Sequence, residues 1–127
     1  MHHTIVYRNP QKLVPHEQVD HIKLASVIRS IKRCGGIRHP VVIDRESNVI
    51  LDGHHRCRAY IELGIKALPC IAVYYYDPAI TLTFRRIDIG LQIIKKGIID
   101  EALKGNMFPH KTTRHKIPNR TKIYVKV

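Results

Sequence analysis

The sequence of 127 residues has no tryptophan, only three cysteines and no long hydrophobic run. Cys34, Cys57 and Cys70 are odd in number and far apart, which fits neither a disulfide framework nor a paired metal-ligand motif. We therefore interpret them as small buried hydrophobic residues. No apolar stretch approaches the about 18 residues that span a membrane, and the N-terminal segment lacks the apolar centre of a signal peptide. We expect a cytoplasmic protein without membrane contact.

Acidic residues are scarce as well. The chain has 10 Asp and Glu against 22 Lys and Arg, so its formal net charge is +12, and no acid follows Glu101. Such a surplus attracts nucleic acid, an acidic membrane surface or phosphorylated small molecules, and the sign of the charge does not distinguish them. The alternative is a solvated basic surface that keeps the protein soluble.

The remaining composition is that of an ordinary globular protein. Hydrophobic residues make up 44% of the chain and charged residues 25%, which is typical of one compact domain with its own core. Strand and helix patterns are intermingled, so we expect a single α+β domain over residues 1–127. Its core is expected at about 1–77, followed by a helical extension and a basic C-terminal segment at about 78–127.

Hydrophobic periodicity predicts the secondary structure of the first part of the chain. Pro15 and Glu17 suit the first turn of a helix, because Pro needs no N–H there and a carboxylate complements the positive helix end. Gly35 ends this helix and Gly64 ends the next one. We expect strands at about 3–7, 40–44, 48–53 and 68–76, the middle two as a hairpin, an extended piece at 12–17, and helices at about 17–33 and 54–63.

The pattern changes after Asp77, where Pro78 breaks the preceding strand. Apolar residues recur at helical spacing from about 87 to 103, and Gly97 predicts a kink or a break in that helix. Residues 107–120 show no periodicity and are expected to be irregular. The alternation in 121–127 predicts an edge strand.

The densest group of polar residues is Asp52-Gly53-His54-His55-Arg56, where a strand gives way to a helix. A helix start directs backbone N–H groups and the positive end of the dipole at one spot, which suits a phosphate. Gly53 allows close approach of the backbone, and the two histidines and Arg56 add side-chain donors. The alternative is an Arg paired with the carboxylate of Asp52 and histidines that merely cap the helix.

Two further groups of residues are candidates. In isolation, a carboxylate such as Glu17 early in a helix does no more than complement the helix dipole. The helix of Glu17 should, however, pack on the same sheet as the Asp52 turn, which would bring two carboxylates to one phosphate site. The segment 111–115, Lys-Thr-Thr-Arg-His, combines hydroxyls, cations and an imidazole between two prolines. A solvated loop is the alternative for this segment.

These motifs, in this order, resemble the ParB and sulfiredoxin superfamily. The resemblance covers about the first 77 positions, rests on LVPHE, GGIRHPVVID, NVILDGHHR and LPCIAVYYY, and implies a mixed sheet with packed helices. Sulfiredoxin needs a catalytic cysteine directly after the loop glycine, where this chain has His54. ParB proper continues with a helix-turn-helix region, and we find no clear pattern for one after Asp77.

The chain is similar to the archaeal free L-serine kinases, in which the Glu of Pro-His-Glu is the catalytic base and an Asp-Gly-His-His-Arg loop binds phosphate. These positions match Glu17 and residues 52–56. Residues of that family that hold serine or phosphoserine match Ser30, Thr113 and His115, and Lys111 and Arg114 are candidates for charge stabilisation or plain surface solubility. A substrate-pocket Trp of the family has no counterpart here.

The resemblance implies transfer of the terminal phosphoryl group of ADP or ATP to the hydroxyl of free L-serine, with Mg²⁺ bridging the phosphates. Such a reaction needs mainly positioning and charge stabilisation, and Asp52 is expected to orient a metal-bound water or a loop donor. The rival hypothesis is a ParB-like DNA-binding or nucleotide-switch protein, which the charge of +12 favours.

Overall fold

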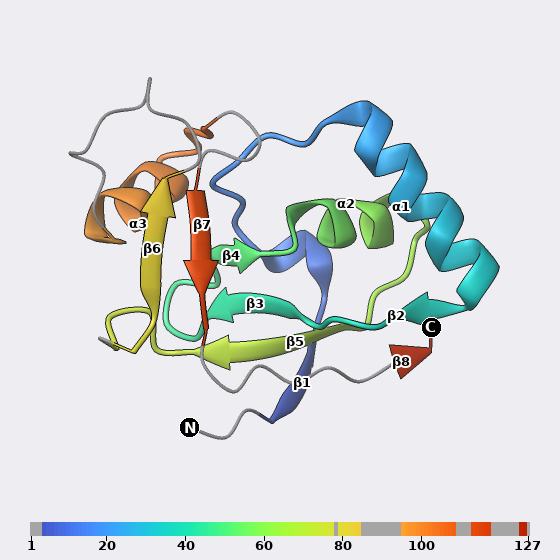
Figure 1. Cartoon of the computed structure of the whole chain (residues 1–127), viewed down its shortest axis with the longest axis horizontal. Helices are drawn as coiled ribbons and strands as arrows, with labels where there is room; N and C mark the ends of the chain where they lie inside the picture. The colour runs from blue at the N-terminus through green and yellow to red at the C-terminus, as the bar shows by residue number, and fades with distance from the viewer. Residues whose placement is uncertain (1–3, 78, 85–94, 109–112, 118–124, 127) are drawn as a thin grey trace.

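The computed structural model describes residues 4–77, 79–84, 95–108, 113–117 and 125–126 (Figure 1). Its centre is a mixed sheet of four strands in the order β1-β5-β3-β4. These strands are β1 (Ile5–Arg8), β3 (Val41–Asp44), β4 (Ile50–Asp52) and β5 (Leu68–Val73). β5 pairs antiparallel with β1 and parallel with β3, and β3 pairs antiparallel with β4. The mixed sheet expected from the sequence is therefore present.

Helices pack on this sheet from both sides. α1 and α2 lie side by side over one face (Figure 1), and α3 packs against the other through Ile99 and Ala102. The described helices are η1 (Pro10–Lys12), α1 (His21–Cys34), α2 (His54–Glu62) and α3 (Lys95–Leu103). Within the described ranges, none of them has the length and apolar character needed to cross a membrane.

Two small sheets complete the described fold. β2 (Gly36–Ile37) pairs antiparallel with β8 (Val125–Lys126) at the end of α1. β6 (Thr81–Phe84) pairs antiparallel with β7 (Thr113–Lys116). Both pairings join segments that are distant in sequence, so they connect the C-terminal part of the chain to its beginning and middle.

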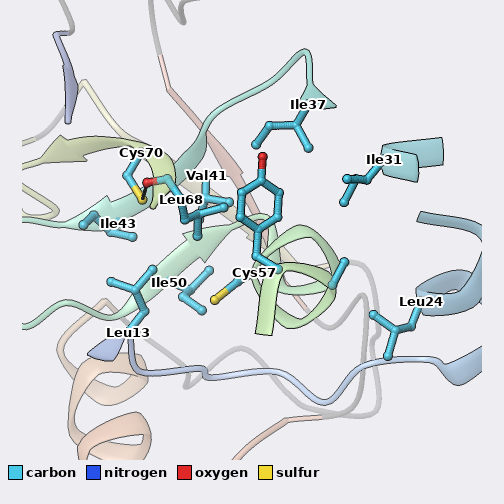
Figure 2. Packing of buried hydrophobic residues seen from close by; sticks show 12 residues of the cluster. Leu13, Leu24, Ile31, Ile37, Val41, Ile43, Ile50, Cys57, Leu68 and Cys70 are labelled. Carbon is cyan, nitrogen blue, oxygen red and sulfur yellow. Dashed lines mark hydrogen bonds between the residues drawn. The ribbon is translucent and has the colours of Figure 1, made fainter. Parts of the chain in front are cut away.

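The central sheet separates two groups of buried apolar side chains. Figure 2 shows the first group, in which Leu24 and Ile31 of α1 belong to the same cluster as Val41 and Ile43 of β3. Val42 belongs to the second group, on the side of α3. Because successive side chains of a strand point to opposite faces and both faces are covered, all of β3 is buried, and its first three residues are apolar.

The first long helix, α1, starts later than its sequence predicts. Asp20 caps it by accepting a hydrogen bond from Ile22 N–H, and Gly35 ends it in the left-handed conformation. The predicted start near residue 17 is therefore wrong, and Glu17 lies in the loop before the helix. The reason is tertiary: the preceding backbone pairs with β4, since Ile50 N–H donates to the carbonyl of Val14.

The second half of the chain holds further corrections. Residues 81–84 form a strand where a helical pattern was expected to follow Asp77, and residues 113–116, expected to be irregular, pair with them. α3 runs through Gly97 without a break. Residues 87–94 of the predicted helix lie outside the described ranges, as do residues 121–124 and 127 of the predicted edge strand. Pairing between distant segments leaves no local periodicity, which explains the two missed strands.

The turn between β4 and α2 depends on Gly53. Its φ of +106° lies in a region that residues with a Cβ rarely adopt. A Cβ at this position would lie 2.9 Å from Val41 Cγ2 and 3.2 Å from Arg56 Nη2. The turn therefore packs directly against β3, and its backbone geometry and its surroundings both require glycine.

Gly53→Ala should lower the free energy of unfolding by about 2–4 kcal/mol, because positive φ costs about 1–2 kcal/mol and overpacking against Val41 adds a similar amount. Gly105→Ala is the matched control, since Gly105 also has a positive φ, +83°, but has open space where the methyl group would lie. Urea denaturation measures both losses. Equal losses in the two variants would contradict the contact between the Gly53 turn and β3.

Candidate active site

Two histidines at the start of α2 hold the segment that precedes α1. His54 Nε2 accepts hydrogen bonds from the backbone N–H groups of His16, at 3.1 Å, and Glu17, at 3.3 Å. His55 Nε2 accepts one from the N–H of Asp20, at 2.9 Å. These contacts place Glu17 next to the Gly53 turn, although the two are far apart in the sequence.

The same contacts locate the proton of each ring. Burial, and to a smaller extent the neighbouring His16, lowers the pKa of His54 to about 3, so this ring is neutral near pH 7. A neutral ring whose Nε2 accepts carries its proton on Nδ1. The sequence predicts donors at His54 and His55, whereas the structure shows both Nε2 atoms as acceptors of backbone N–H groups.

Glu17 lies beside a buried histidine. The residue is only 9% exposed, and its Oε2 is 3.4 Å from Nε2 of the fully buried His16. His16 Nδ1 lies 2.6 Å from the carbonyl oxygen of Ile50. Phe108 accepts from Gln18 N–H and donates to the His16 carbonyl, both at 2.7 Å. The backbone on both sides of Glu17 is therefore held from two directions, by the start of α2 and by residue 108.

A third segment joins them through His115 of β7. The His115 ring lies 5.6 Å from that of His16, which in turn lies 4.6 Å from that of His54, and both pairs meet edge to face. Tyr75 Oη is 2.6 Å from His115 Nε2. Burial also lowers the pKa of His115 to about 3. His16, His54 and His115, which we call the histidine cluster, thus unite three separate segments beside Glu17.

Arg56 leans toward the buried side of α2, as the sequence predicts. Its Nη1 donates to the carbonyl oxygen of His39 and, at 3.3 Å, to that of Pro40. Its Nη2 lies 3.4 Å from Asp52 Oδ2, and the Arg56 side chain is 19% exposed. The pairing of Arg56 with the carboxylate of Asp52, considered above as the alternative to a phosphate site, is therefore observed.

A cavity of about 330 Å³ lies beside Glu17, a volume that suits a small ligand. Glu17 and His54 form polar parts of its wall, and much of the remainder is apolar, including Leu13, Ile50 and Ile61. Arg56 is not among the described residues that line it, because the guanidinium points toward the start of β3. The structure thus brings Glu17 and the first residue of α2 to one cavity and places the Arg56 cation on another side of the turn.

The remaining predicted site residues lie in α1, in β7 or outside the described ranges. Ser30 is half-buried in the third turn of α1, about 14 Å along the helix axis from its start. Thr113 and Arg114 lie in β7 opposite Phe84 and Thr83. Lys111 and the side chains of Thr113 and Arg114 lie outside what the structure describes, so their roles stay predictions.

Two residues of the site were missed in the sequence, His16 and Tyr75. His16 is part of Pro-His-Glu, where only the carboxylate attracted attention. Tyr75 is fully buried, while Tyr74 and Tyr76 are 40% and 39% exposed. The alternation of buried and exposed side chains at the end of β5 continues through these three tyrosines. This period of two could have identified Tyr75 as the tyrosine that faces inward.

The buried histidines predict a loss of stability in acid. A histidine with a folded-state pKa of about 3 binds fewer protons between pH 6.5 and 3 than the same residue in the unfolded chain. The free energy of unfolding should therefore fall as the pH drops below about 6.5, by at most about 1.4 kcal/mol per pH unit for each histidine. Urea denaturation at about pH 7.5 and about pH 5 measures this slope.

Two variants separate the contribution of His54 from that of other histidines. His54→Gln keeps a hydrogen-bond acceptor but removes the titrating group, so its slope should be shallower than that of the wild type. His21→Gln, at the exposed start of α1, should keep the wild-type slope. A wild-type slope in His54→Gln would show that His54 does not resist protonation in the folded protein.

Sequence comparisons give relatives for this chain. Residues 4–82 match the model of the ParB N-terminal domain. The chain is 32% identical over 105 residues to an ATP-dependent L-serine kinase of Staphylothermus marinus, over 74% of this chain and 42% of that protein. It is 37% identical over 70 residues to a ParB-like protein of Sulfolobus acidocaldarius, over 53% of this chain and 33% of that protein. The chain spans less than half the length of these relatives.

Solved structures share the fold. A conserved hypothetical protein from Pyrococcus furiosus aligns with a TM-score of 0.81 at 16% identity and covers 99% of this chain and 96% of that one. A free serine kinase in complex with AMP aligns with a TM-score of 0.78 at 15% identity, over 98% and 91%. Identities this low show the fold alone. Because the family model matches more than half of its residues, the chain belongs to the ParB N-terminal domain family.

Proposed function

We propose that the protein is a kinase that transfers the terminal phosphoryl group of ATP or ADP to the hydroxyl of free L-serine, giving O-phospho-L-serine. The observation that carries this proposal is the position of Glu17: its carboxylate lies at a ligand-sized cavity, and its backbone is tied to the first residue of α2. The match to an L-serine kinase named as ATP-dependent supports the choice of reaction, and structures of serine kinases with AMP or ADP support a nucleotide donor.

The start of α2 is the proposed phosphate site. Its N-cap is Gly53, which has no side chain to occupy the first turn, and the positive end of the helix dipole favours an anion there. The Nδ1 N–H group of His54 is a further donor. Arg56 adds a fixed positive charge behind the turn, where it offsets the charge of the phosphates and of Asp52.

Glu17 is the proposed general base. It would accept the proton of the serine hydroxyl while the serine oxygen bonds to the terminal phosphorus and the bond from that phosphorus to the nucleotide oxygen breaks. A carboxylate suits this role only if it is held at the acceptor. The hydrogen bonds from the backbone of residues 16 and 17 to His54 supply that restraint.

The phosphates of the nucleotide would bring Mg²⁺ with them. Mg²⁺ keeps several waters and is usually bound by one or two carboxylates together with substrate phosphates. Asp52, with a side chain 40% exposed, is the residue proposed to hold it through a metal-bound water. The ion would offset the negative charge of the phosphates.

The acceptor amino acid is proposed to contact residues of the C-terminal part. Thr113 and Ser30 are assigned to serine binding by the family resemblance. His115 is 8% exposed and bonded to Tyr75, so its contribution would be to shape the site from behind the histidine cluster. Lys111 and Arg114 are proposed to offset charge.

Glu17→Gln should stay folded and lose at least about 100-fold in turnover, because removing a general base costs about 10²- to 10⁴-fold. The measurement is phosphoserine formed from L-serine, Mg²⁺ and either ATP or ADP, with the thermal unfolding midpoint as the test of folding. Glu46→Gln, an exposed carboxylate in the β3–β4 turn, is the control and should keep full activity. Equal turnover in Glu17→Gln would contradict the assigned role.

Arg56→Lys should weaken AMP and ADP binding by at least about tenfold, because Lys lacks the planar fork with which Arg56 holds the turn between the carbonyls before β3 and Asp52. Arg33→Lys is the control, because Arg33 is exposed in the last turn of α1 and is not among the residues that line the cavity. Calorimetric titration measures both affinities. Unchanged affinity in Arg56→Lys would remove Arg56 from the phosphate site.

A further inference from the structure

The exposed side of α1 carries charge of one sign only. Residues 21–43, which cover α1, β2 and most of β3, contain no Asp or Glu. The exposed cations of α1, which together we call the α1 face, are Lys23, Arg29, Lys32 and Arg33. Exposed Arg38 follows directly after β2. This part of the surface is therefore more uniformly positive than the composition of the whole chain requires.

The two arginines of the α1 face lie in one row on the outside of the molecule. Arg29 and Arg33 are one turn apart, on the side of the helix opposite the buried Ile31. Ile22, which is 82% exposed, and Ser26 continue the row toward the start of the helix. Figure 1 shows α1 at the edge of the molecule, with α2 packed on its inner side. The row thus lies on exposed surface.

The other two long helices pair exposed cations with acids one turn away. Arg58 of α2 contacts Glu62, and Lys96 of α3 contacts Asp100. Within the ranges that the structure describes, no cation of the α1 face forms an ion pair. The described protein therefore leaves the positive charge of this face unneutralised.

The cations of the α1 face also repel one another. Arg29 lies three residues before Lys32 and four before Arg33, spacings at which like charges destabilise a helix. The negative end of the helix dipole favours Lys32 and Arg33, which lie in the last turn. It does not act on Lys23 or Arg29, which lie further from that end. An anionic partner outside the protein would relieve this repulsion.

We propose that the α1 face binds the phosphate backbone of duplex DNA without reading its sequence. From Lys23 to Arg33 the helix rises about 15 Å, and duplex DNA carries about nine phosphate charges over that length. One isolated phosphate group matches one cation, whereas a polyanion matches the whole row. The small side chains of Ala25 and Ser26 lie between these cations and leave room for a close approach.

Duplex DNA suits this face better than duplex RNA. The major groove of B-DNA is about 12 Å wide and admits an α-helix, while that of an RNA duplex is deep and narrow. The contact needs no helix-turn-helix, for which the sequence after Asp77 has no clear pattern. It is also separate from the proposed kinase site, because none of the four cations is among the described residues that line the cavity.

Fluorescence anisotropy of a labelled DNA duplex, titrated with the full chain at about 50 to 200 mM salt, tests this surface. The triple variant Arg29→Gln, Lys32→Gln, Arg33→Gln should bind at least about tenfold more weakly at the lower salt concentration. The slope of log affinity against log salt should become shallower by about 2–3, because each phosphate contact contributes about 0.9. The single variant Arg29→Gln should make it shallower by about 1, and it provides the same test if the triple variant does not fold.

The matched control removes the same amount of charge from exposed cations outside α1, through Arg45→Gln, Lys96→Gln and Lys104→Gln. Lys96 and Lys104 belong to α3, on the other face of the central sheet. The control should bind duplex DNA within about twofold of the wild type, with the wild-type salt slope. Equal losses in the two triple variants would show that only the net charge attracts DNA and would overturn the proposal.

Two alternative partners are compared in the same titration, a duplex RNA of the same sequence and vesicles of phosphatidylserine. The wild type should bind the DNA duplex more tightly than either of them. Tighter binding to the RNA or to the vesicles would assign the α1 face to another partner and overturn the proposal. The absence of any DNA binding at about 50 mM salt, where phosphate contacts are strongest in this range, would also refute it.

Discussion

The site depends on hydrogen bonds that run from the backbone of one loop to the side chains of one helix start. The N–H groups of His16, Glu17 and Asp20 all donate to histidine rings at the first two positions of α2. A loop without regular structure must satisfy its backbone polar groups elsewhere, and a buried N–H left unpaired is costly. The rings of His54 and His55 meet that need and thereby determine where the Glu17 carboxylate lies.

This arrangement links the protonation of the histidines to the shape of the site. A ring can accept a backbone N–H only while the accepting nitrogen is unprotonated, and burial holds His54 in that state. The neutral rings also keep positive charge away from the interior of a protein whose formal charge is already +12. Cations are placed at the edge instead, where Arg56 bonds to the carbonyls before β3.

Sequence reasoning was reliable where a residue acts through its own neighbours. The helix end at Gly35, the close backbone approach at Gly53, the inward lean of Arg56 and the apolar face of α1 all follow from local spacing, and the structure confirms them. It failed where a distant segment competes for the backbone. The predicted helix start near Glu17 is wrong because the loop pairs with β4 and α2, and β7 was missed because its partner is β6.

The sequence by itself determined that a strand, a glycine turn and a helix follow one another at residues 50–62. It also gave Pro-His-Glu and the late Thr-Arg-His segment as candidates for a site. Only the tertiary structure decided that His16, His54 and His115 share one buried cluster, and that Arg56 points to a different side of the turn from the cavity. The physical reason is that local spacing sets the face of the helix or strand on which a side chain lies. The hydrogen-bond partners of that side chain, and hence its protonation state, depend on which distant backbone groups need a hydrogen bond.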